Sequence, residues 1–356
     1  MELNVLDRLK EDDDIVQNLK VKTFNKSEIR LKKEVNGADS IGNLLFLATS
    51  NGCSVYRYDK DSLYEFITLE RDKKCLDAIC CTNYLVIVIM LNEALSLQFY
   101  RIEDILNKIV TKSYSSIEIA KTGPLAIDDK NDRVFIAGTL WSGSWSSNER
   151  NSTSNECLER LVRVYRIETM ELEEKFEAVK NRIKLLRIDG NQIAIADNLH
   201  GVRIFCTNSL KLLYEIEVDE IRNIILVGDY LAVFHKFESN VSLWNSQEKK
   251  TILCLNIQDQ VKELLDDDDA DILLDEDTET SVINLPYEDS GLLLYATRTG
   301  NVFGMIVNSR YKLFSISSPF SEEEEKYGLK TLCYIHPGLI VLVSKSLVVL
   351  DFNLPK

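Results

Sequence analysis

The sequence predicts an all-β fold built from one short unit that recurs along the chain. In each unit an apolar strand is followed by a tight polar turn and a second strand that ends on a bulky residue. Leu44–Gly52 runs into Val55–Asp59 in this way, and Gln192–Gly201 runs into Val202–Cys206. A self-similar unit of about 40–60 residues built only from strands is typical of a β-propeller. The repeats therefore predict a propeller in which each unit forms one four-stranded blade.

Length and composition favour a single domain. The 356 residues are 45% apolar, which is enough for a core, and closed all-β folds often reach this length as one domain. With only 5 prolines and 14 glycines, the chain contains no long flexible linker. We expect a tail or short helix over residues 1–18 and one propeller over 19–356. Insertions are expected at about 141–157, 259–280 and 319–328.

Alternating or short apolar runs bounded by turn residues define the strands of each blade. The first three predicted blades contain Ile29–Val35, Leu44–Ser50, Ser54–Asp59 and Tyr64–Leu69; Leu76–Cys81, Leu85–Leu91, Ala94–Arg101 and Ile109–Tyr114; and Pro124–Ile127, Val134–Leu140, Leu161–Ile167 and Glu174–Ala178. The next three contain Ile183–Ile188, Gln192–Ala196, Val202–Cys206 and Leu212–Val218; Arg222–Val227, Tyr230–His235, Val241–Trp244 and Thr251–Asn256; and Ser281–Leu285, Leu292–Thr297, Val302–Val307 and Lys312–Ser317.

The last blade has only three strands, Lys330–Tyr334, Leu339–Ser344 and Leu347–Phe352, before the chain stops. A spare strand-like segment, Leu19–Phe24, precedes the first blade. If this segment completes the last blade, two exposed sheet edges disappear at once. The sequence thus predicts seven blades closed by an N-terminal strand. Six blades is the alternative, because the borders of the second and third blades are weakly marked.

A bulky residue recurs near the end of the third strand of each blade. The set is Tyr58, Tyr100, Tyr165, Phe205, Trp244, Met305 and Leu350, and the residues that follow are Asp59, Arg101, Arg166, Cys206, Asn245, Ile306 and Asp351. This pattern resembles a degenerate WD40 repeat, whose third strand ends on Trp-Asp. The Gly-His pair of ordinary WD40 repeats is absent, and so is the hydrogen-bond network that depends on it. The resemblance implies a diverged WD40-like propeller of the kind found in nucleoporins, vesicle-tethering subunits and other assembly components, with no subfamily identified.

Charge and cysteine usage limit the class of partner and compartment. The net charge of −15 opposes direct binding to nucleic acid and favours protein partners with basic or peptide-like segments. Most of the eight cysteines fall inside apolar strands, where free thiols act as small hydrophobic groups. The N-terminus lacks a secretion signal, and the longest apolar run, Tyr84–Leu91, is too short to span a membrane. We expect an intracellular protein, cytoplasmic or nuclear or both, and no homo-oligomer.

Catalytic motifs are missing from the sequence. It contains no phosphate-binding glycine loop, no nucleophile elbow, no His-Glu-x-x-His and no Cys-x-x-Cys. The three histidines, His200, His235 and His336, are too scattered to be assigned as metal ligands. We therefore expect no enzyme, no cofactor and no metal site.

The most conspicuous candidate site is an acidic insertion with a short apolar centre. Its candidate residues are Asp266, Asp267, Asp268, Asp269, Asp271, Ile272, Leu273, Leu274, Asp275, Glu276 and Asp277. Such a block repels itself and is most simply a solvated loop. Its functional interpretation is an electrostatic binding segment for a basic partner. A calcium site is a third option, but the run lacks the glycine and final glutamate of an EF-hand loop.

Three further segments are candidate partner-binding sites. Trp141 and Trp145 lie in a long insertion, where exposed aromatic side chains would suit a binding hot spot, or would instead cover the blade. Glu322, Glu323, Glu324 and Glu325 join the last two blades as a second acidic run, and a solvated connector is the alternative. The stretch 1–18 has leucines at spacing three, which permits a docking helix or a frayed tail.

These observations lead to a non-catalytic scaffold or adaptor subunit of an intracellular complex as the first hypothesis. The second is an acidic escort chaperone for a basic client such as a ribosomal-protein, histone or localisation segment. The third is an accessory subunit of an RNA-processing, RNA-modification or nuclear-pore assembly. The fourth is an enzyme whose active site lines a central channel, with Asp77, Arg187, Asp189 and Arg222 on the inner strands.

Overall fold

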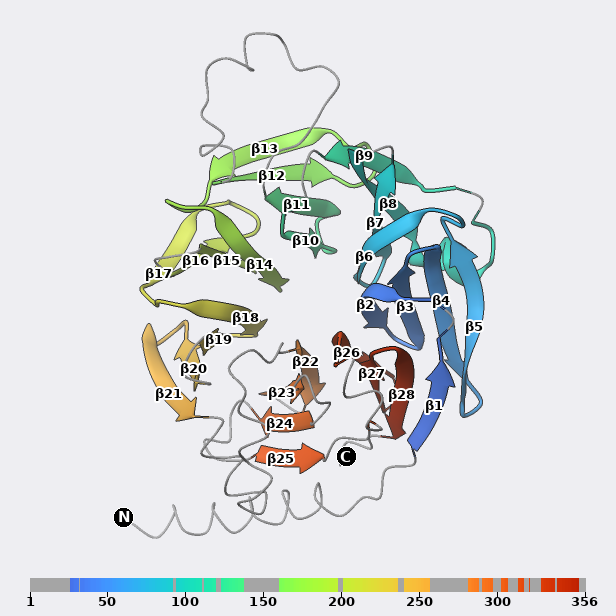
Figure 1. The fold of residues 1–356 in the computed structure, drawn as a ribbon. Coiled ribbons are helices and arrows are strands. Elements are labelled where there is room, and N and C mark those ends of the chain that lie inside the picture. The colour runs from blue at the N-terminus through green and yellow to red at the C-terminus, as the bar shows by residue number, and fades with distance from the viewer. Residues whose placement is uncertain are drawn as a thin grey trace.

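The computed structural model describes most of the chain in segments. These are residues 26–31, 33–91, 94–110, 112–119, 123–137, 160–197, 201–235, 240–256, 281–287, 290–296, 302–306, 313–316, 320, 328–336 and 338–351. Figure 1 shows their strands grouped into sheets that surround a common centre.

The described strands form seven four-stranded antiparallel sheets. The first contains β2 (Val35–Ile41), β3 (Leu44–Thr49), β4 (Gly52–Asp59) and β5 (Ser62–Leu69). The second contains β6 (Lys74–Cys80), β7 (Tyr84–Leu91), β8 (Ala94–Arg101) and β9 (Ser115–Ile119), with the short helix α2 (Ile102–Leu106) between the last two strands. The third contains β10 (Leu125–Asp128), β11 (Arg133–Ala137), β12 (Leu161–Arg166) and β13 (Leu172–Glu177).

The remaining sheets repeat the same order. The fourth contains β14 (Ile183–Asp189), β15 (Gln192–Asp197), β16 (Val202–Cys206) and β17 (Leu212–Ile216). The fifth contains β18 (Ile221–Val227), β19 (Tyr230–His235), β20 (Asn240–Asn245) and β21 (Lys250–Asn256). The sixth contains β22 (Ser281–Tyr287), β23 (Ser290–Ala296), β24 (Val302–Ile306) and β25 (Leu313–Ile316). The last contains β26 (Thr331–Ile335), β27 (Leu339–Val343), β28 (Ser346–Asp351) and β1 (Lys26–Arg30).

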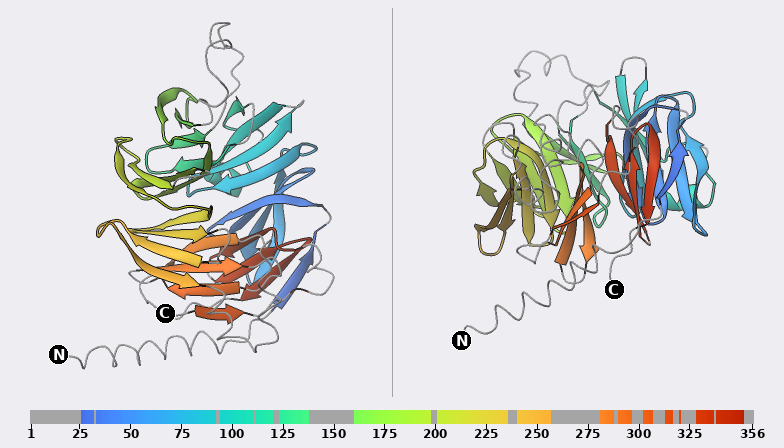
Figure 2. Two further views of the ribbon diagram at one scale, coloured as in Figure 1. Left: turned by 60° about the vertical axis from the view of Figure 1, so that its left-hand side comes forward. Right: turned by 60° about the horizontal axis from the view of Figure 1, so that its bottom comes forward.

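Apolar clusters join the sheets face to face. Seven such clusters occur in the described part, and each combines residues of two sheets. The last sheet shares one cluster with the first, which includes Leu45 and Val341, and another with the sixth, which includes Leu294 and Leu332. Each fully buried Leu, Ile, Val or Phe contributes about 1.5–3 kcal/mol to stability. An all-β fold of stacked four-stranded sheets, of the kind found in propellers, is thus confirmed, and the views in Figure 2 agree with it.

The second strand of each sheet explains why the sequence pattern was readable. β3 is buried along its whole length, and six of the eight residues of β7 are buried. Both faces of such a strand pack against neighbouring sheets, so its sequence is a continuous apolar run rather than an alternation. Outer strands carry a weaker signal because water covers them, as on β13, which is exposed over most of its residues. Among the described residues, no helix is long and apolar enough to cross a membrane.

The N-terminal strand that completes the last sheet is β1. It pairs antiparallel with β28, with Ile29 opposite Leu347. The segment predicted for this role, Leu19–Phe24, lies outside the described residues, and Ile29 was wrongly assigned to the first blade. That sheet begins instead with β2, whose sequence Val-Asn-Gly-Ala-Asp-Ser-Ile carries little strand signal because most of its residues are only partly buried.

A second correction concerns the outer strand of the second sheet, predicted over Ile109–Tyr114. The structure has α2 followed by β9 instead, and Ile109 is 66% exposed. Ile102 and Ile105 are the buried residues of α2, at helical spacing. The run of apolar residues around Ile109 was therefore not a buried strand.

Strand register also corrects one member of the recurring bulky set. Tyr56 lies opposite Leu45, just as Tyr100 lies opposite Leu85 and Trp244 opposite Leu231. The equivalent residue in the first sheet is therefore Tyr56 and not Tyr58. Because β4 continues to Asp59, the end of the strand was the wrong reference point.

Two glycines fix the turn between the second and third strands. Gly52 has φ +108° and Gly201 has φ +125°, a region that side chains rarely adopt. A Cβ on Gly52 would lie 2.8 Å from the carbonyl oxygen of Leu69, and one on Gly201 would overlap the carbonyl of Ile216. In both repeats the turn thus packs directly on the backbone at the end of the outer strand.

We expect Gly201→Ala to lower the free energy of unfolding by about 3 kcal/mol, because it combines a strained φ with a backbone overlap. Gly190→Ala is the matched control, since Gly190 has φ +56° and nothing within 4 Å of the added carbon. It should cost about 1 kcal/mol for the backbone conformation alone. Urea unfolding of both variants measures the difference, and equal losses would contradict the packing argument.

Candidate functional site: the central channel

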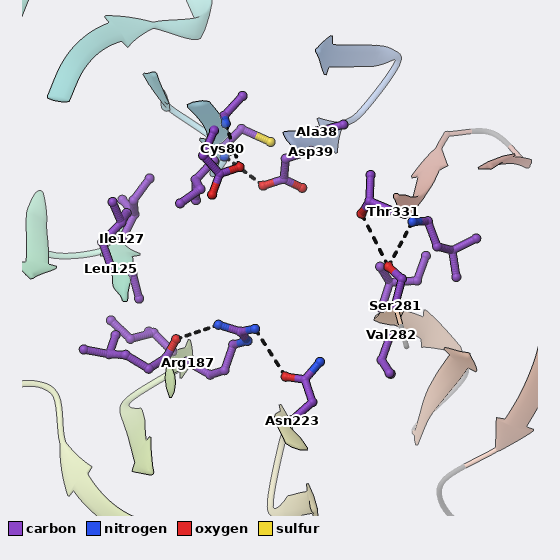
Figure 3. A pocket seen from close by; sticks show the side chains of 18 of the residues that line it. Ala38, Asp39, Cys80, Leu125, Ile127, Arg187, Asn223, Ser281, Val282 and Thr331 are labelled. Atoms are coloured by element: carbon purple, nitrogen blue, oxygen red, sulfur yellow. Dashed lines mark hydrogen bonds between the residues drawn. The ribbon is translucent and has the colours of Figure 1, made fainter. Parts of the chain in front are cut away.

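A channel runs through the centre of the sheets and is lined by their first strands. One cavity of about 500 Å³ is bordered by residues of β2, β6, β10, β14, β18, β22 and β26. A second cavity of about 430 Å³ adjoins it. Both cavities are bordered by Asp39, Arg187, Ile188, Val282 and Ile283, so these residues stand where the two spaces meet. Figure 3 shows the larger cavity with Asp39 and Arg187 on different strands.

Two aspartates on neighbouring strands are held by backbone N–H groups. The Oδ1 of Asp39 accepts a hydrogen bond from its neighbour Ser40 N at 2.8 Å, and Oδ2 accepts one from Cys80 N on β6 at 2.9 Å. Asp39 therefore links two sheets. Asp77 Oδ1 accepts from Ala78 N at 2.9 Å. Gly37 on β2 lies so close to Asp77 that a Cβ there would be 3.1 Å from its Cα and would overlap its carboxylate.

Arg187 is one of two positively charged residues that border the larger cavity, and Lys330 is the other. The guanidinium of Arg187 donates to Asn223 Oδ1 on β18 at 3.3 Å and to the backbone oxygen of Leu186 at 2.9 Å. Asn223 is in turn oriented by the N–H of Ile224, 2.9 Å from the same oxygen. None of the ion pairs found within the described segments includes Arg187. The guanidinium thus bridges two sheets without direct contact to a carboxylate.

Burial sets the protonation of these groups. It raises the pKa of Asp39 despite two backbone hydrogen bonds and the charge of Arg187, all of which act in the opposite direction. Burial also raises the pKa of Asp77 to about 6, and the neighbouring charge of Asp39 adds to that rise. The pKa of Arg187 is lowered by burial, although both aspartates counteract the change. Water reaches Arg187 inside the cavity, but surrounding protein limits its hydration.

The structure brings together two of the four inner-strand residues named from the sequence. Asp77 and Arg187 border the same cavity. Asp189 borders the second one and accepts a hydrogen bond from Gly228 N at 2.8 Å, whereas Arg222 borders neither. Asp39 and Asn223 were missed. A charged or amide residue inside a first strand was the signal that could have placed them in the channel. For Asp39 this signal was lost, because β2 was not recognised as a first strand.

The histidines and acidic candidates fall elsewhere. His235 is 2.8 Å from Ser242 Oγ through its Nε2, and His336 borders the second cavity. The candidate partner-binding residues Trp141, Trp145, 266–277 and 322–325 lie outside the described residues, as do His200 and the stretch 1–18. They remain sequence predictions. Within the segments that the structure describes, no group of three or more His, Cys, Asp or Glu residues is arranged to hold a metal ion.

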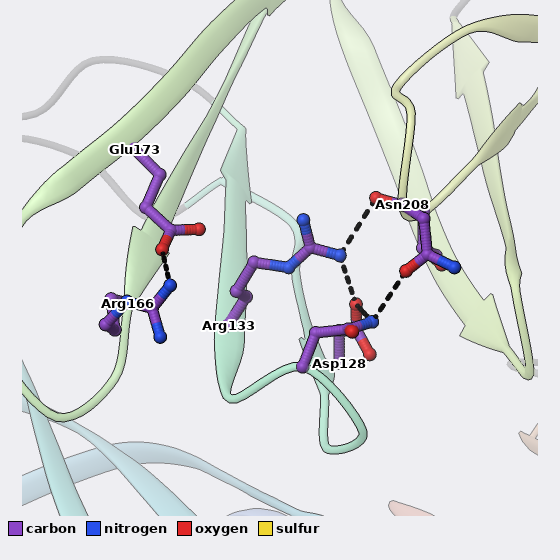
Figure 4. Close-up of polar contacts among 7 residues, drawn as sticks. Asp128, Arg133, Arg166, Glu173 and Asn208 are labelled. Carbon is purple, nitrogen blue, oxygen red and sulfur yellow. Dashed lines mark hydrogen bonds and ion pairs between the residues drawn. The ribbon is translucent and has the colours of Figure 1, made fainter.

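A second polar cluster, shown in Figure 4, joins the third and fourth sheets. Arg133 contacts Asp128 at 2.7 Å and the backbone oxygen of Thr207 at 2.9 Å. Asn131 donates to Asp128 at 2.8 Å and to Asn208 at 3.0 Å. The Arg133 and Asp128 side chains are 11% and 1% exposed. Removing either partner of such a buried pair is costly, so this cluster holds the sheets together rather than binding a substrate.

No family model matches the chain, and no curated protein matches it either. Among solved structures, the fold is similar to a chain in a crystal structure of a mitotic checkpoint complex. The TM-score is 0.60 at 9% sequence identity, over 94% of this chain and 96% of that one. At this identity the likeness concerns the fold alone. Together with the four-stranded antiparallel sheets, it supports an all-β fold of the propeller type for the chain.

Asp77→Asn tests the protonation of the channel. The pKa of Asp77 is about 6 in the folded protein and 3.8 in the unfolded chain. The folded protein therefore becomes less stable as the pH rises from 3.8 through about 6. We expect the variant to have a higher Tm than the wild type at pH 8, and the difference to shrink towards pH 5. Thermal unfolding at both pH values provides the measurement. If the substitution lowered Tm by the same amount at both pH values, the raised pKa of Asp77 would be contradicted.

Proposed function

We propose that this chain is a non-catalytic scaffold subunit of an intracellular multiprotein complex, built on a seven-bladed propeller that β1 closes. The observation that carries the proposal is the fold: its likeness to a chain from a checkpoint complex extends over 94% of the residues. Seven sheets and seven shared clusters support the blade count. The pairing of β1 with β28 supports closure.

A body of this kind suits assembly because its shape is fixed by packing between sheets. Loops and outer strands on a rigid support provide surfaces for several partners at once. The net charge of −15 favours partners with basic segments and opposes direct contact with nucleic acid. We place the complex in the cytoplasm, the nucleus or both.

The absence of catalysis is part of the proposal. Both oxygens of Asp39 already accept backbone hydrogen bonds, and Arg187 is directed to Asn223. In the larger cavity the thiol of Cys80 hydrogen-bonds the carboxylate of Asp39, but burial first and then the charge of Asp39 raise the pKa of that thiol, which disfavours the nucleophilic thiolate. The channel groups therefore support binding and packing better than proton transfer or covalent chemistry.

The acidic charge favours a second candidate, an escort that shields one basic client. Its binding would be dominated by exposed charges and would weaken steeply with salt. A scaffold differs by retaining several partners through buried contacts that persist in salt.

The test is affinity purification of the tagged chain from its own cells in low and high salt, followed by gel filtration. We expect several proteins in fixed ratio, elution well above the 40.8 kDa of the monomer, and recovery of this chain when a partner is tagged instead. A single basic protein lost in high salt would favour the escort. Elution as a monomer in both conditions would contradict both functions.

A charge-neutral variant separates the roles of the two acidic segments. The acidic residues within 266–277 are replaced by Asn or Gln, and Glu322 to Glu325 are replaced by Gln in the matched variant. If the chain is a scaffold, it retains most partners in both variants. If it is an escort, it loses its client when the acidic residues within 266–277 are neutralised.

A further inference from the structure

A surface on the outside of the first two sheets combines exposed apolar side chains with two cations. We call it the Phe66 patch, and its members are Arg57, Tyr64, Phe66, Leu106, Lys108 and Ile109. Tyr64 on β5 is 41% exposed, Leu106 at the end of α2 is 38% exposed, and Ile109 is 66% exposed. Ile109 is the most exposed large apolar residue in the part of the chain that the structure describes. Large apolar groups that gather on a surface mark an interaction site.

The turn that follows α2 has a fixed backbone. The N–H groups of Asn107, Lys108 and Ile109 each donate to a carbonyl oxygen of the helix at 3.0 Å. Both flanks are anchored, because Ile105 is buried and Val110 packs against the apolar cluster that the first two sheets share. The exposure of Ile109 is therefore a property of the packed fold.

Two positively charged side chains share one aromatic ring in this patch. The Cζ of Arg57 lies 5.5 Å from the ring centroid of Phe66, and the Nζ of Lys108 lies 4.4 Å from it. Tyr64 is directly opposite Arg57 across β4 and β5, so both side chains lie on the same face of the sheet. None of the ion pairs within the described segments includes Arg57 or Lys108, and the buried Nε of Arg57 has no hydrogen-bond acceptor there.

Acidic side chains of the β4–β5 hairpin have other partners. Glu65 follows Tyr64 on β5, so its side chain projects from the opposite face. Its Oε1 accepts hydrogen bonds from the hydroxyl groups of Ser54 at 3.2 Å and Thr68 at 2.8 Å. Asp61 accepts one from the hydroxyl group of Tyr58 at 3.3 Å.

The remaining acidic neighbours do not neutralise the two cations. Glu103 and Asp104 lie in the first turn of α2, where a carboxylate complements the helix N-terminus, whereas Lys108 follows the other end of the helix. Asp59 precedes the turn between β4 and β5. None of these three carboxylates is within ion-pair distance of Arg57 or Lys108. The positive charge around the Phe66 ring is therefore available to a carboxylate from outside.

We propose that the Phe66 patch docks a segment of a partner protein in which a carboxylate lies beside bulky apolar side chains. Any partner that covers Leu106 and Ile109 also removes water from Lys108 and Arg57, and a cation that loses water without a counter-charge is costly. A carboxylate supplies that counter-charge through charge-assisted hydrogen bonds. A purely apolar segment lacks it, and a basic segment would be repelled. The inference does not depend on the scaffold role, because the patch can be tested on the isolated chain.

Four fluorescein-labelled peptides with amidated ends test the chemistry by fluorescence polarisation at pH 7.5. Their sequences are Asp-Leu-Leu-Asp-Leu, Asn-Leu-Leu-Asn-Leu, Lys-Leu-Leu-Lys-Leu and Asp-Gly-Gly-Asp-Gly. We expect the Asp-Leu peptide to bind at least about fivefold more tightly than the Asn-Leu peptide, because it forms two partly exposed ion pairs. The Lys-Leu peptide should bind more weakly than both. The Asp-Gly peptide should bind at least about tenfold more weakly than the Asp-Leu peptide, because it buries no apolar side chain.

A charge variant locates the carboxylate contact. Lys108→Asn should weaken the Asp-Leu peptide at least about threefold and change the Asn-Leu peptide less than about twofold. Lys249→Asn is the matched control, because Lys249 is also exposed and has φ +53°, close to the +56° of Lys108, which asparagine tolerates. It should leave the affinity of both peptides unchanged.

An apolar variant locates the other half of the contact. Ile109→Ser should weaken the Asp-Leu and Asn-Leu peptides together, at least about threefold. Leu212→Ser on β17 is the control, since Leu212 is an exposed apolar residue of another sheet. Equal binding of the Asp-Gly peptide would assign a general anion site and overturn the proposal. Equal binding of the Asp-Leu, Asn-Leu and Lys-Leu peptides, unchanged affinity of Lys108→Asn and Ile109→Ser, or no binding of the Asp-Leu peptide at millimolar protein would also overturn it.

Discussion

The pairing of β1 with β28 is the contact on which the rest of the arrangement depends. It places residues 26–30 in one sheet with residues 331–351, so the beginning and the end of the described chain share a single hydrogen-bonded ladder. Without β1, that sheet has three strands and β28 has an unpaired edge. The last sheet also packs on both the first and the sixth, so loosening it exposes two apolar clusters at once.

The sheets surround a common centre, onto which their first strands face. First strands face a channel rather than a two-sided core, and they therefore carry polar residues at positions that would otherwise be apolar. Asp39 uses this position to bond Cys80 N of the next sheet, and Arg187 uses it to reach Asn223. The polar lining of the cavity is thus built from the same contacts that hold neighbouring sheets together.

The sequence predicted the buried second strands well, because burial on both faces produces continuous apolar runs such as those of β3 and β7. It failed where the structure depends on contacts distant in sequence. β2 has a polar sequence, and Asp39 and Cys80 are 41 residues apart, so neither the strand nor its channel role is visible locally. The outer strand of the second sheet was predicted over Ile109–Tyr114, and the helical spacing of Ile102 and Ile105 just before it was not recognised. The acidic and tryptophan candidates came from composition, and they lie outside the described residues.

The most direct test of the account compares two N-terminal deletions by urea unfolding. Removing residues 1–25 leaves β1 intact, and removing residues 1–31 eliminates it. The account predicts that the first deletion changes the free energy of unfolding by less than about 0.5 kcal/mol. The second should lower it by about 2 kcal/mol or more, through lost ladder hydrogen bonds and the exposure of Ile29 and its neighbours. Equal stability of the two deletions would contradict the claim that β1 holds the last sheet together.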